Sequence, residues 1–433
     1  MSRKRVKLEV TDAQVLKRQL LRACDQNEHA LFLDSNNHND QYSRFHWLAG
    51  YGAHQVLNTD KNSLGQLQEL HESNKDWLLG HLSYELRMEL ENLPCRHEDM
   101  LGFPHLQFFV PKILVYKDET GIWLETKSVV SAKDFLSSLP PPVSEDDSPD
   151  ESVSLTPLTR ESDYLETVER LIQELQYGNI YEINYCMEFA ARQQLQDPAV
   201  AFLELDQHTE APFAAYYRSN DLYLLCASPE RYLCKRDRMI ISQPMKGTAR
   251  RDADPAVDRH LKAELAINEK ERSENVMITD LVRNDLSKIA RKGSVAVNEL
   301  FGVYTYRNVH QMLSTVSCEV DDSLKLADLI GATFPMGSMT GAPKYSAMQL
   351  IDRHEAFQRG LYSGSVGYIT PQGDCDFNVV IRSILYNRSS AYLSARVGSA
   401  ITIHCNAQKE YEECLLKADS LRRSLQRHSM SAG

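Results

Sequence analysis

The spacing of apolar residues along the chain predicts a mixture of helices and strands. Apolar side chains recur every three or four residues between Tyr164 and Leu175, as in an amphipathic helix, and Gly178 then supplies a stop signal. Two longer segments, about 258–282 and about 407–426, contain neither proline nor glycine and are also expected to be helical. Short apolar runs next to turn residues predict strands, among them 30–33, 106–115, 222–227 and 239–242.

A segment with almost no apolar residues divides the chain. Residues 140–152 read PPPVSEDDSPDES, with four prolines and five acidic residues. Such a segment buries too little surface to offset the entropy of ordering it, so it is expected to be a linker or a long exposed loop. The predicted organisation is an N-terminal region 1–137, a linker 138–157 and a C-terminal region 158–428.

Composition and charge exclude several classes of protein. The chain carries 48 lysines and arginines against 60 aspartates and glutamates, a net charge of −12, so nucleic acid is not an expected partner. No run of 18 apolar residues exists, so no membrane partner is expected, and the basic start lacks the apolar segment of a signal peptide. The nine cysteines form no CxxC pair, which argues against a disulfide framework or a zinc site and fits the cytoplasm.

Pairs of glutamates three residues apart occur on both long helical segments. Glu271 and Glu274 share one face of the first, and Glu410 and Glu413 share one face of the second. Lys417 extends the second stripe by one turn. Four carboxylates converging from two helices would repel one another unless a cation lay between them, and Mg²⁺ prefers such oxygen ligands together with water. The alternative interpretation is two solvated helix faces.

A lysine–glycine–threonine turn and a nearby glutamate form a second candidate. In the sequence PMKGTAR at 244–250, Gly247 lets backbone N–H groups approach a ligand and Thr248 adds a hydroxyl donor. Lys246 is a possible nucleophile or base, provided that its surroundings lower its pKa. If the preceding residues form a hairpin, Glu230 faces the same pocket as a general acid or base. The alternative is a strand end followed by a turn with a solvated lysine.

Three runs rich in glycine and hydroxyl side chains would admit a ligand close to the backbone. They are 335–344, 363–368 and 397–400, and exposed N–H groups in such runs bind carboxylate oxygens. Arg382 lies inside the apolar run 377–385 and is expected to be buried or half-buried. Such an arginine needs an anion, which is either a carboxylate ligand or the partner in a structural salt bridge.

Together these segments resemble the chorismate-utilising enzyme family, and the resemblance extends over nearly the whole chain. The matching segments, in the family's order, are GNIYEIN at 178–184, SPE at 228–230, PMKGTAR at 244–250, KERSENVMITDLVRND at 270–285, FPMGSMTGAPK at 334–344, GSVGY at 364–368, IR at 381–382 and EYEECLLK at 410–417. The aromatic stretch 77–86, whose plain interpretation is core packing, resembles the family's N-terminal segment. The resemblance implies an α+β fold of two large antiparallel sheets packed together, with helices outside and a cleft for chorismate and Mg²⁺.

The resemblance also implies a role for each matching residue. Glu274 and Glu413 match direct Mg²⁺ ligands, whereas Glu271 and Glu410 match residues that reach the metal through water. Gly247 and Thr248 match donors to the ring carboxylate. Further contacts with substrate carboxylates are implied at Tyr368, Arg382, Gly398, Ser399, Ala400 and Lys417. Lys246 matches a covalent nucleophile, and Glu230 matches a general acid or base.

Two residues distinguish between branches of the family. Members that add water have a lysine where this chain has Glu182, so ammonia is the expected nucleophile. Lys246 stands where anthranilate synthases usually have alanine. In having a lysine here, the chain resembles component I of the aminodeoxychorismate synthases, in which this lysine attacks ring C2 before ammonia adds at C4. The alternatives are an anthranilate or isochorismate-type synthase and, from another class, a catalytically silent binding subunit.

The source of ammonia is expected to be a second protein. No glutaminase triad is visible in the sequence, and the length leaves no room for a further domain, so a separate glutamine amidotransferase subunit is predicted. The chain departs from the family's pattern at Gln311, where histidine is frequent, and at Ser383 in place of threonine. The stretch Val397–Ala400 replaces a glycine-rich one. These departures concern substrate contacts and leave the class unchanged.

Overall fold

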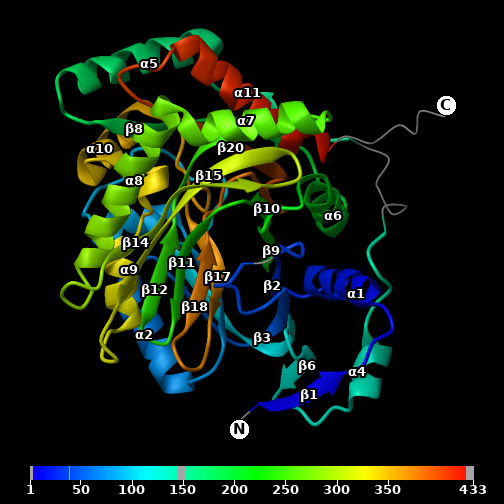
Figure 1. Ribbon diagram of the computed structural model, residues 1–433. Coiled ribbons are helices and arrows are strands. Elements are labelled where there is room, and N and C mark those ends of the chain that lie inside the picture. The colour runs from blue at the N-terminus through cyan, green and yellow to red at the C-terminus, as the bar shows by residue number, and fades with distance from the viewer. Residues whose placement is uncertain (1–2, 39, 145–151, 426–433) are drawn as a thin grey trace.

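The strands pair in antiparallel orientation and build two layers (Figure 1). The computed structural model describes residues 3–38, 40–144 and 152–425. The first layer has the strand order β7–β8–β20–β19–β10–β9–β2–β3–β5–β6–β1, and the short β16 also pairs with β8. In chain order its strands are β1 (Lys4–Leu8), β2 (His29–Asp34), β3 (Trp47–Thr59), β5 (Leu106–Asp118), β6 (Gly121–Thr126), β7 (Thr156–Pro157), β8 (Glu182–Arg192), β9 (Phe213–Ser219), β10 (Leu222–Ser228), β16 (Gly341–Ala342), β19 (Ser383–Asn387) and β20 (Tyr392–Ile401).

The second layer continues from the same long strand β5. Residues 106–109 of β5 pair with β4, whereas residues 113–118 pair with β6, so one strand serves both layers. The order is β4–β17–β18–β11–β12–β15, and β13 and β14 both pair with β15. The strands are β4 (Leu78–Leu82), β11 (Arg231–Arg236), β12 (Met239–Gln243), β13 (Met245–Arg250), β14 (Ala296–Thr305), β15 (Val309–Glu319), β17 (Ser365–Ile369) and β18 (Cys375–Asn378). The two predicted sheets are therefore two layers of one hydrogen-bonded network.

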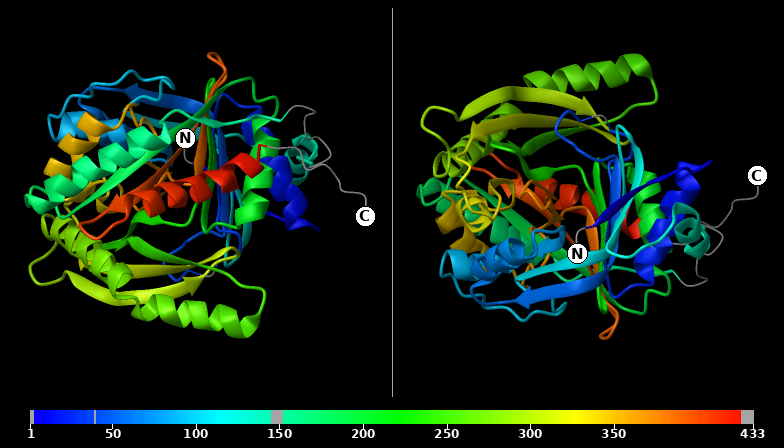
Figure 2. Two further views of the ribbon diagram at one scale, coloured as in Figure 1. Left: turned by 90° about the horizontal axis from the view of Figure 1, so that it is seen from above. Right: turned by 90° about the horizontal axis from the view of Figure 1, so that it is seen from below.

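Alternating residues of the first layer face two different cores. In β10, Tyr223 and Leu225 belong to a core shared with the outer helices, whereas Leu224 and Cys226 belong to the core shared with the second layer. This alternation is what a strand covered on both faces requires. The predicted α+β class, with antiparallel sheets inside and helices outside, is confirmed (Figure 2).

Helices cover the outer faces of both layers. The first layer packs against α1 (Ala13–Asp25), α5 (Glu161–Gln176), α6 (Pro198–Thr209), α10 (Lys344–His354) and α11 (Ala407–Arg423). The second packs against α2 (Ser63–Asn74), α8 (Glu269–Ser287) and α9 (Leu326–Thr333). The remaining helices are α3 (Arg87–Leu90), α4 (Ala132–Ser138) and α7 (Pro255–Ile267). Figure 1 shows α5 and α11 side by side across the top of the molecule.

One prediction is wrong: a segment expected to form a single helix forms two. The segment expected to be continuous over 258–282 breaks at Asn268, which ends α7 with an extended backbone, φ −65° and ψ 116°. The side chain of Asn268 then accepts a hydrogen bond from the N–H of Glu271 and caps α8. Because α7 and α8 are separate helices, the orientation of the glutamate face on α8 does not depend on that of α7. The helix predicted over residues 164–175 and the strands named above are confirmed.

The predicted linker joins parts that share one sheet network. Residues 145–151, its acidic centre, lie outside the described residues. On either side of them, Val143 and Val153 are buried in the first core. Strands β2 and β4 of the N-terminal region pair with β9 and β17 of the C-terminal region. The division at 138–157 stays a prediction about organisation along the sequence.

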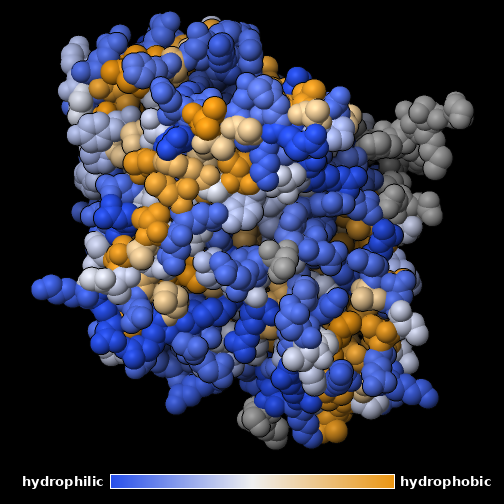
Figure 3. Space-filling view, viewed as in Figure 1, coloured by the Kyte–Doolittle hydropathy of each residue, from blue (hydrophilic) through white to orange (hydrophobic). Residues whose placement is uncertain are grey.

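Among the described residues, no helix combines the length and the apolar character needed to cross a bilayer. Figure 3 shows a largely polar face on which apolar side chains gather in separate patches. All nine cysteines lie in the described parts as free thiols, and most are buried, as expected.

Arg359 ties together the segments that lie behind the candidate site. It is 1% exposed, donates to both carboxylate oxygens of Glu355 at 2.6 and 2.9 Å, and donates to the backbone oxygens of Asn184 and Met339. Removing one partner of a buried charge pair leaves the other charge uncompensated. We expect Arg359→Met to lower the free energy of unfolding by about 3–5 kcal/mol, measured by urea denaturation.

A matched control for Arg359 exists on the surface. Arg160 pairs with Asp163 at 2.9 Å, but its side chain is 81% exposed. Solvent screens such a pair, so Arg160→Met should leave the urea midpoint within the error of the measurement. Equal effects of the two substitutions would contradict the role given to burial.

Candidate active site

A cavity of about 610 Å³ opens between the two layers and helices α8 and α11. Strands β13 and β20 and the ends of β10 and β15 contribute further lining residues. Of the residues predicted from the sequence, the cavity is lined by Glu230, Lys246, Gly247, Thr248, Glu271, Glu274, Arg382, Gly398, Ser399, Ala400, Glu410, Glu413 and Lys417. Elements far apart in the sequence therefore bring all of the predicted site residues together except Tyr368.

The four glutamates line one wall of this cavity. Glu271 and Glu274 lie on α8, and Glu410 and Glu413 lie on α11, as their spacing predicts. Lys270 links the two helices, with its Nζ 3.7 Å from Glu274 Oε1 and 3.5 Å from Glu410 Oε1. The two helix faces therefore meet at a common, strongly charged surface.

The site disfavours the ionised form of most of these carboxyl groups. Burial, reinforced by Glu182 and Glu271, raises the pKa of Glu274 to about 7 despite the opposing attraction of Lys246. Burial and the charge of Glu413 likewise raise the pKa values of Glu271 and Glu410. A cation among these groups would offset the lost hydration and the mutual repulsion.

Glu413 is the exception among the four. Burial opposes its ionisation too, but Lys417 lies 2.6 Å away and lowers the pKa of Glu413 below its ordinary value. A carboxylate that stays ionised is a suitable ligand for a cation.

The carboxylates of this wall are chemically suited to a Mg²⁺ ion whose other ligands would be water and substrate oxygens. Glu274 Oε1 is buried and accepts no hydrogen bond from the described residues, and with Lys270 Nζ 3.7 Å away it keeps the capacity to bind a cation. Over residues 3–38, 40–144 and 152–425, no cluster of three or more acidic, histidine or cysteine side chains forms a complete metal cage. Mg²⁺ is commonly held by one or two carboxylates and otherwise by water and substrate oxygens, which this arrangement allows.

Lys246 and Glu230 face the same cavity through the predicted hairpin. Strands β11 and β12 pair from Arg231 with Gln243 to Arg236 with Met239, so the residues just outside the hairpin lie side by side. Burial raises the pKa of Glu230 to about 7, against the attraction of Lys246. A carboxyl group with a pKa near neutrality can both donate and accept a proton at physiological pH.

Lys246 has a carboxylate partner that its position in the sequence did not suggest. Its Nζ lies 2.6 Å from Glu182 Oε1, and the Glu182 side chain is 1% exposed. Although burial lowers the pKa of Lys246, the charges of Glu182 and Glu274 outweigh it and raise that pKa overall. In this structure Lys246 is therefore an ammonium group until a proton leaves it.

The turn after Lys246 requires glycine. Gly247 has φ +87°, and a Cβ atom there would lie 3.0 Å from Glu271 Oε2. Gln311, the departure from the family's pattern, holds this turn: its Nε2 donates to Gly247 O at 2.8 Å, and its Oε1 accepts from Thr248 Oγ1 at 2.9 Å. The glutamine thus fixes the donors that the sequence comparison assigned to a ligand carboxylate.

Two further cations, Arg382 and Lys417, line the cavity. Arg382 is half-buried, and its guanidinium forms neither an ion pair nor a hydrogen bond within the described part of the chain. A structural salt bridge, one of the two predicted alternatives, is therefore not formed among those residues. Lys417 Nζ donates to Gly398 O at 2.7 Å, so it holds strand β20 at the cavity edge. An anionic ligand would supply the partner that Arg382 lacks.

The comparison with known proteins agrees with this geometry. Residues 20–423 match the chorismate binding enzyme family. The chain belongs to that family. Aminodeoxychorismate synthase component 1 of Bacillus subtilis is 32% identical over 362 residues, which cover 80% of this chain and 76% of that protein. The protein of the same name from Escherichia coli is 33% identical over 354 residues, covering 81% and 77%.

Solved structures of chorismate-binding enzymes share the fold. Anthranilate synthase component I from Streptococcus pneumoniae superposes with a TM-score of 0.77 at 24% identity, over 89% of this chain and 94% of that one. The menaquinone-specific isochorismate synthase of Escherichia coli also gives a TM-score of 0.77, at 17% identity over 98% and 94%. At this identity the likeness establishes the fold alone, and it confirms the fold expected from the sequence.

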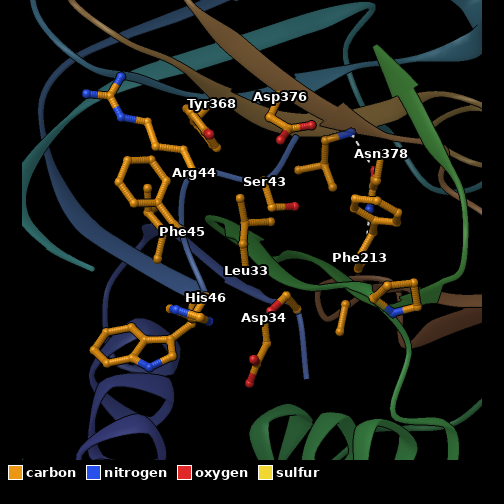
Figure 4. Close-up of a pocket in the computed structure, with 16 residues that line it drawn as sticks. Leu33, Asp34, Ser43, Arg44, Phe45, His46, Phe213, Tyr368, Asp376 and Asn378 are labelled. Carbon is orange, nitrogen blue, oxygen red and sulfur yellow. Dashed lines mark hydrogen bonds between the residues drawn. The ribbon is translucent and has the colours of Figure 1, made fainter. Parts of the chain in front are cut away.

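Tyr368 is the predicted site residue that the structure places elsewhere. It is 4% exposed and lines a separate pocket of about 60 Å³ with Phe45, Arg44 and Asp376, as Figure 4 shows. Its hydroxyl accepts a hydrogen bond from Arg236 at 3.0 Å. The structure therefore does not place Tyr368 at the cavity in which it was predicted to contact a substrate carboxylate.

Tyr362 is the tyrosine that faces the chorismate-family cavity. It precedes β17, whereas Tyr368 lies within β17, and it lines the cavity together with Arg382. The matching segment GSVGY at 364–368 contains only Tyr368, and the tertiary structure shows that Tyr362, two residues before that segment, reaches the cavity. Asn184, Ser338 and Lys270 also line the cavity and were not predicted as site residues, although each lies in a matching segment.

Proposed function

We propose that the chain is the chorismate-binding component of an aminodeoxychorismate synthase, which forms 4-amino-4-deoxychorismate from chorismate and ammonia. The observation that carries the proposal is Lys246 in the cavity, close to Glu230 and paired with Glu182. The relatives named aminodeoxychorismate synthase component 1 support the same activity. An anthranilate or isochorismate-type activity is disfavoured because neither needs a lysine nucleophile at this position.

The charges of the cavity fit a dicarboxylate substrate. Glu274 and Glu413 would hold Mg²⁺ directly, and Glu271 and Glu410 would hold it through water. When bound, the ion would anchor the ring carboxylate and withdraw electron density from the ring. In the same cavity, Arg382 has an unused guanidinium for the second carboxylate.

Lys246 and Glu230 divide the chemistry between them. The Lys246 amine attacks ring C2, the ring double bonds shift, and the C4–O bond breaks. Glu230 donates the proton with which the C4 oxygen leaves as water. Ammonia then attacks C4, the bond from C2 to Nζ breaks, and Glu230 takes the surplus proton from the new amine. Two easier displacements replace one difficult substitution of hydroxide by ammonia.

Ammonia is assigned to a separate glutaminase subunit. The relatives named component 1 are, by that name, parts of a larger enzyme, which supports a partner for this chain as well. Free ammonium at raised pH should substitute for the partner in solution. The product is expected to supply p-aminobenzoate and folate synthesis in the cytoplasm.

Product identification tests this function. The purified chain, given chorismate, Mg²⁺ and ammonium chloride, is expected to form 4-amino-4-deoxychorismate, identified by chromatography and mass spectrometry. The same run without ammonium serves as the control and should form no aminated product. Anthranilate or isochorismate as the main product, or no product at all, would contradict the assignment.

A further inference from the structure

The pairing of Lys246 with Glu182 is buried and specific. Glu182 Oε1 lies 2.6 Å from Lys246 Nζ, the Glu182 side chain is 1% exposed, and that of Lys246 is 12% exposed. The second oxygen, Glu182 Oε2, is buried and accepts no hydrogen bond from the described residues. The carboxylate therefore has one strong partner and one oxygen with unused acceptor capacity.

Strand pairing fixes Glu182 in this place. Glu182 begins β8, opposite Ala342 of β16. A Cβ atom on the neighbouring Gly341 would lie 2.2 Å from the carbonyl oxygen of Glu182, so the two backbones are in close contact. The cavity wall includes Lys246 but not Glu182, which lies behind the lysine. Glu182 can therefore act on a substrate only through Lys246.

The charges around Lys246 keep it protonated before substrate binds. The groups that face it are the carboxylates of Glu182, Glu274 and Glu230, and all three raise its pKa. Among the described residues, Glu182 is the carboxylate within ion-pairing distance of Nζ. An ammonium nitrogen has no lone pair to donate, so one proton must leave Lys246 before it can attack a carbon atom.

We propose that Glu182 is the positioning residue that takes the proton from Lys246 as the lysine attacks, and returns it when the lysine is released. The inference rests on the proposed function and adds the Glu182 carboxylate to its mechanism. The proton moves from Nζ to Glu182 Oε1, and the freed electron pair forms the bond to ring C2. When that bond breaks, the pair returns to Nζ, which recovers its proton from Glu182.

Burial favours such a transfer over a permanent ion pair. Moving one proton converts two buried charges into two neutral groups, and the desolvation of charges is the main cost of a buried ion pair. Glu230 is not available for this step, because it must hold a proton for the departing C4 oxygen. A carboxylate at position 182 thus has a task in the covalent step.

The pH profile of turnover distinguishes this role from a structural one. A proton shared inside the pair does not exchange with solvent, so with saturating chorismate and ammonia the wild-type kcat should follow only the titration of Glu230, whose pKa is about 7. In Glu182→Gln the lysine proton must go to solvent, so the ratio of its kcat to that of the wild type should rise about tenfold per pH unit between pH 6 and 8. At pH 7 kcat should be about 100-fold lower than in the wild type. The KM for chorismate should not change.

Two further variants keep the test independent of folding. Glu182→Asp retains a carboxylate and should keep the shape of the wild-type profile at a reduced rate. Asp285→Asn breaks another buried lysine pair, with Lys344 at 2.5 Å, which does not line the cavity, and it should lower thermal stability without changing the profile. A Glu182→Gln profile with the wild-type shape, or a rising limb in Glu182→Asp that the wild type lacks, would overturn the proposal. Absence of aminated product from the wild type would instead reject the proposed function.

Discussion

Replacing Lys246 with alanine is expected to lower kcat for the aminated product by at least ~10³-fold, because the covalent route loses its nucleophile. Among the described residues, the other lysines that line the cavity are Lys270 and Lys417, and both pair with the four-glutamate wall and not with Glu182. Initial rates with chorismate, Mg²⁺ and ammonium, followed by product chromatography, measure the effect. Chorismate should still bind, because Arg382 and the glutamates remain.

Lys246→Arg separates nucleophilicity from charge. Arginine keeps a cation beside Glu182 but has no amine that deprotonates near neutrality, so it should be as inactive as alanine. Intact mass spectrometry provides a second observable. With chorismate and without ammonia, the wild type should accumulate an adduct of chorismate minus water, and neither variant should. Substantial turnover in Lys246→Arg would show that the lysine supplies only charge.

Spacing in the sequence was sufficient to predict the glutamate wall. A separation of three residues places Glu271 with Glu274, and Glu410 with Glu413, on single helix faces whatever the rest of the fold does. The break at Asn268 was not predictable from composition, because 258–282 contains no proline or glycine. Asparagine is nevertheless a favoured cap, and Glu271 three residues later completes that signal.

Contacts between residues that are distant in the sequence were not predictable from the sequence pattern. Lys246 and Glu182 belong to different strands, β13 and β8, and only their tertiary arrangement shows that they pair. The tyrosines Tyr362 and Tyr368 illustrate the same limit. The motif directs attention to Tyr368, but the fold places Tyr368 at a separate pocket and Tyr362 at the cavity.

The net charge of the chain gave little information about its site. A chain at −12 is a poor host for an anion on average, yet Lys246, Lys270, Arg382 and Lys417 all line the cavity. Three of these cations contact carboxylates of the same region, so the site is closer to neutral than the chain. The ion pairs within the cavity, and not the net charge of the chain, decide which ligand the cavity can bind.

Replacing Glu274 with glutamine is expected to abolish Mg²⁺ binding at the cavity. The substitution keeps the shape of the side chain and removes the charge of a carboxylate whose Oε1 is buried and accepts no hydrogen bond. Mg²⁺ affinity should fall at least ~100-fold, since changing residues that only support a ligand already costs about 10–100-fold. Thermal unfolding measures this without reference to activity. For the wild type, Mg²⁺ at 100 times its Kd should stabilise the fold by about 2.7 kcal/mol.

The stability of the same variant without Mg²⁺ separates lost binding from misfolding. Burial raises the pKa of Glu274 to about 7. Above that pH the group is ionised in both states, and its charge lowers the stability of the folded protein relative to the unfolded chain. Glutamine removes this unfavourable charge, and at pH 8 without metal the Tm of Glu274→Gln should be no lower than that of the wild type. Glu269→Gln, an exposed change on the same helix, should keep the full Mg²⁺-dependent rise in Tm. A Glu274→Gln protein that retains that rise would place the metal elsewhere.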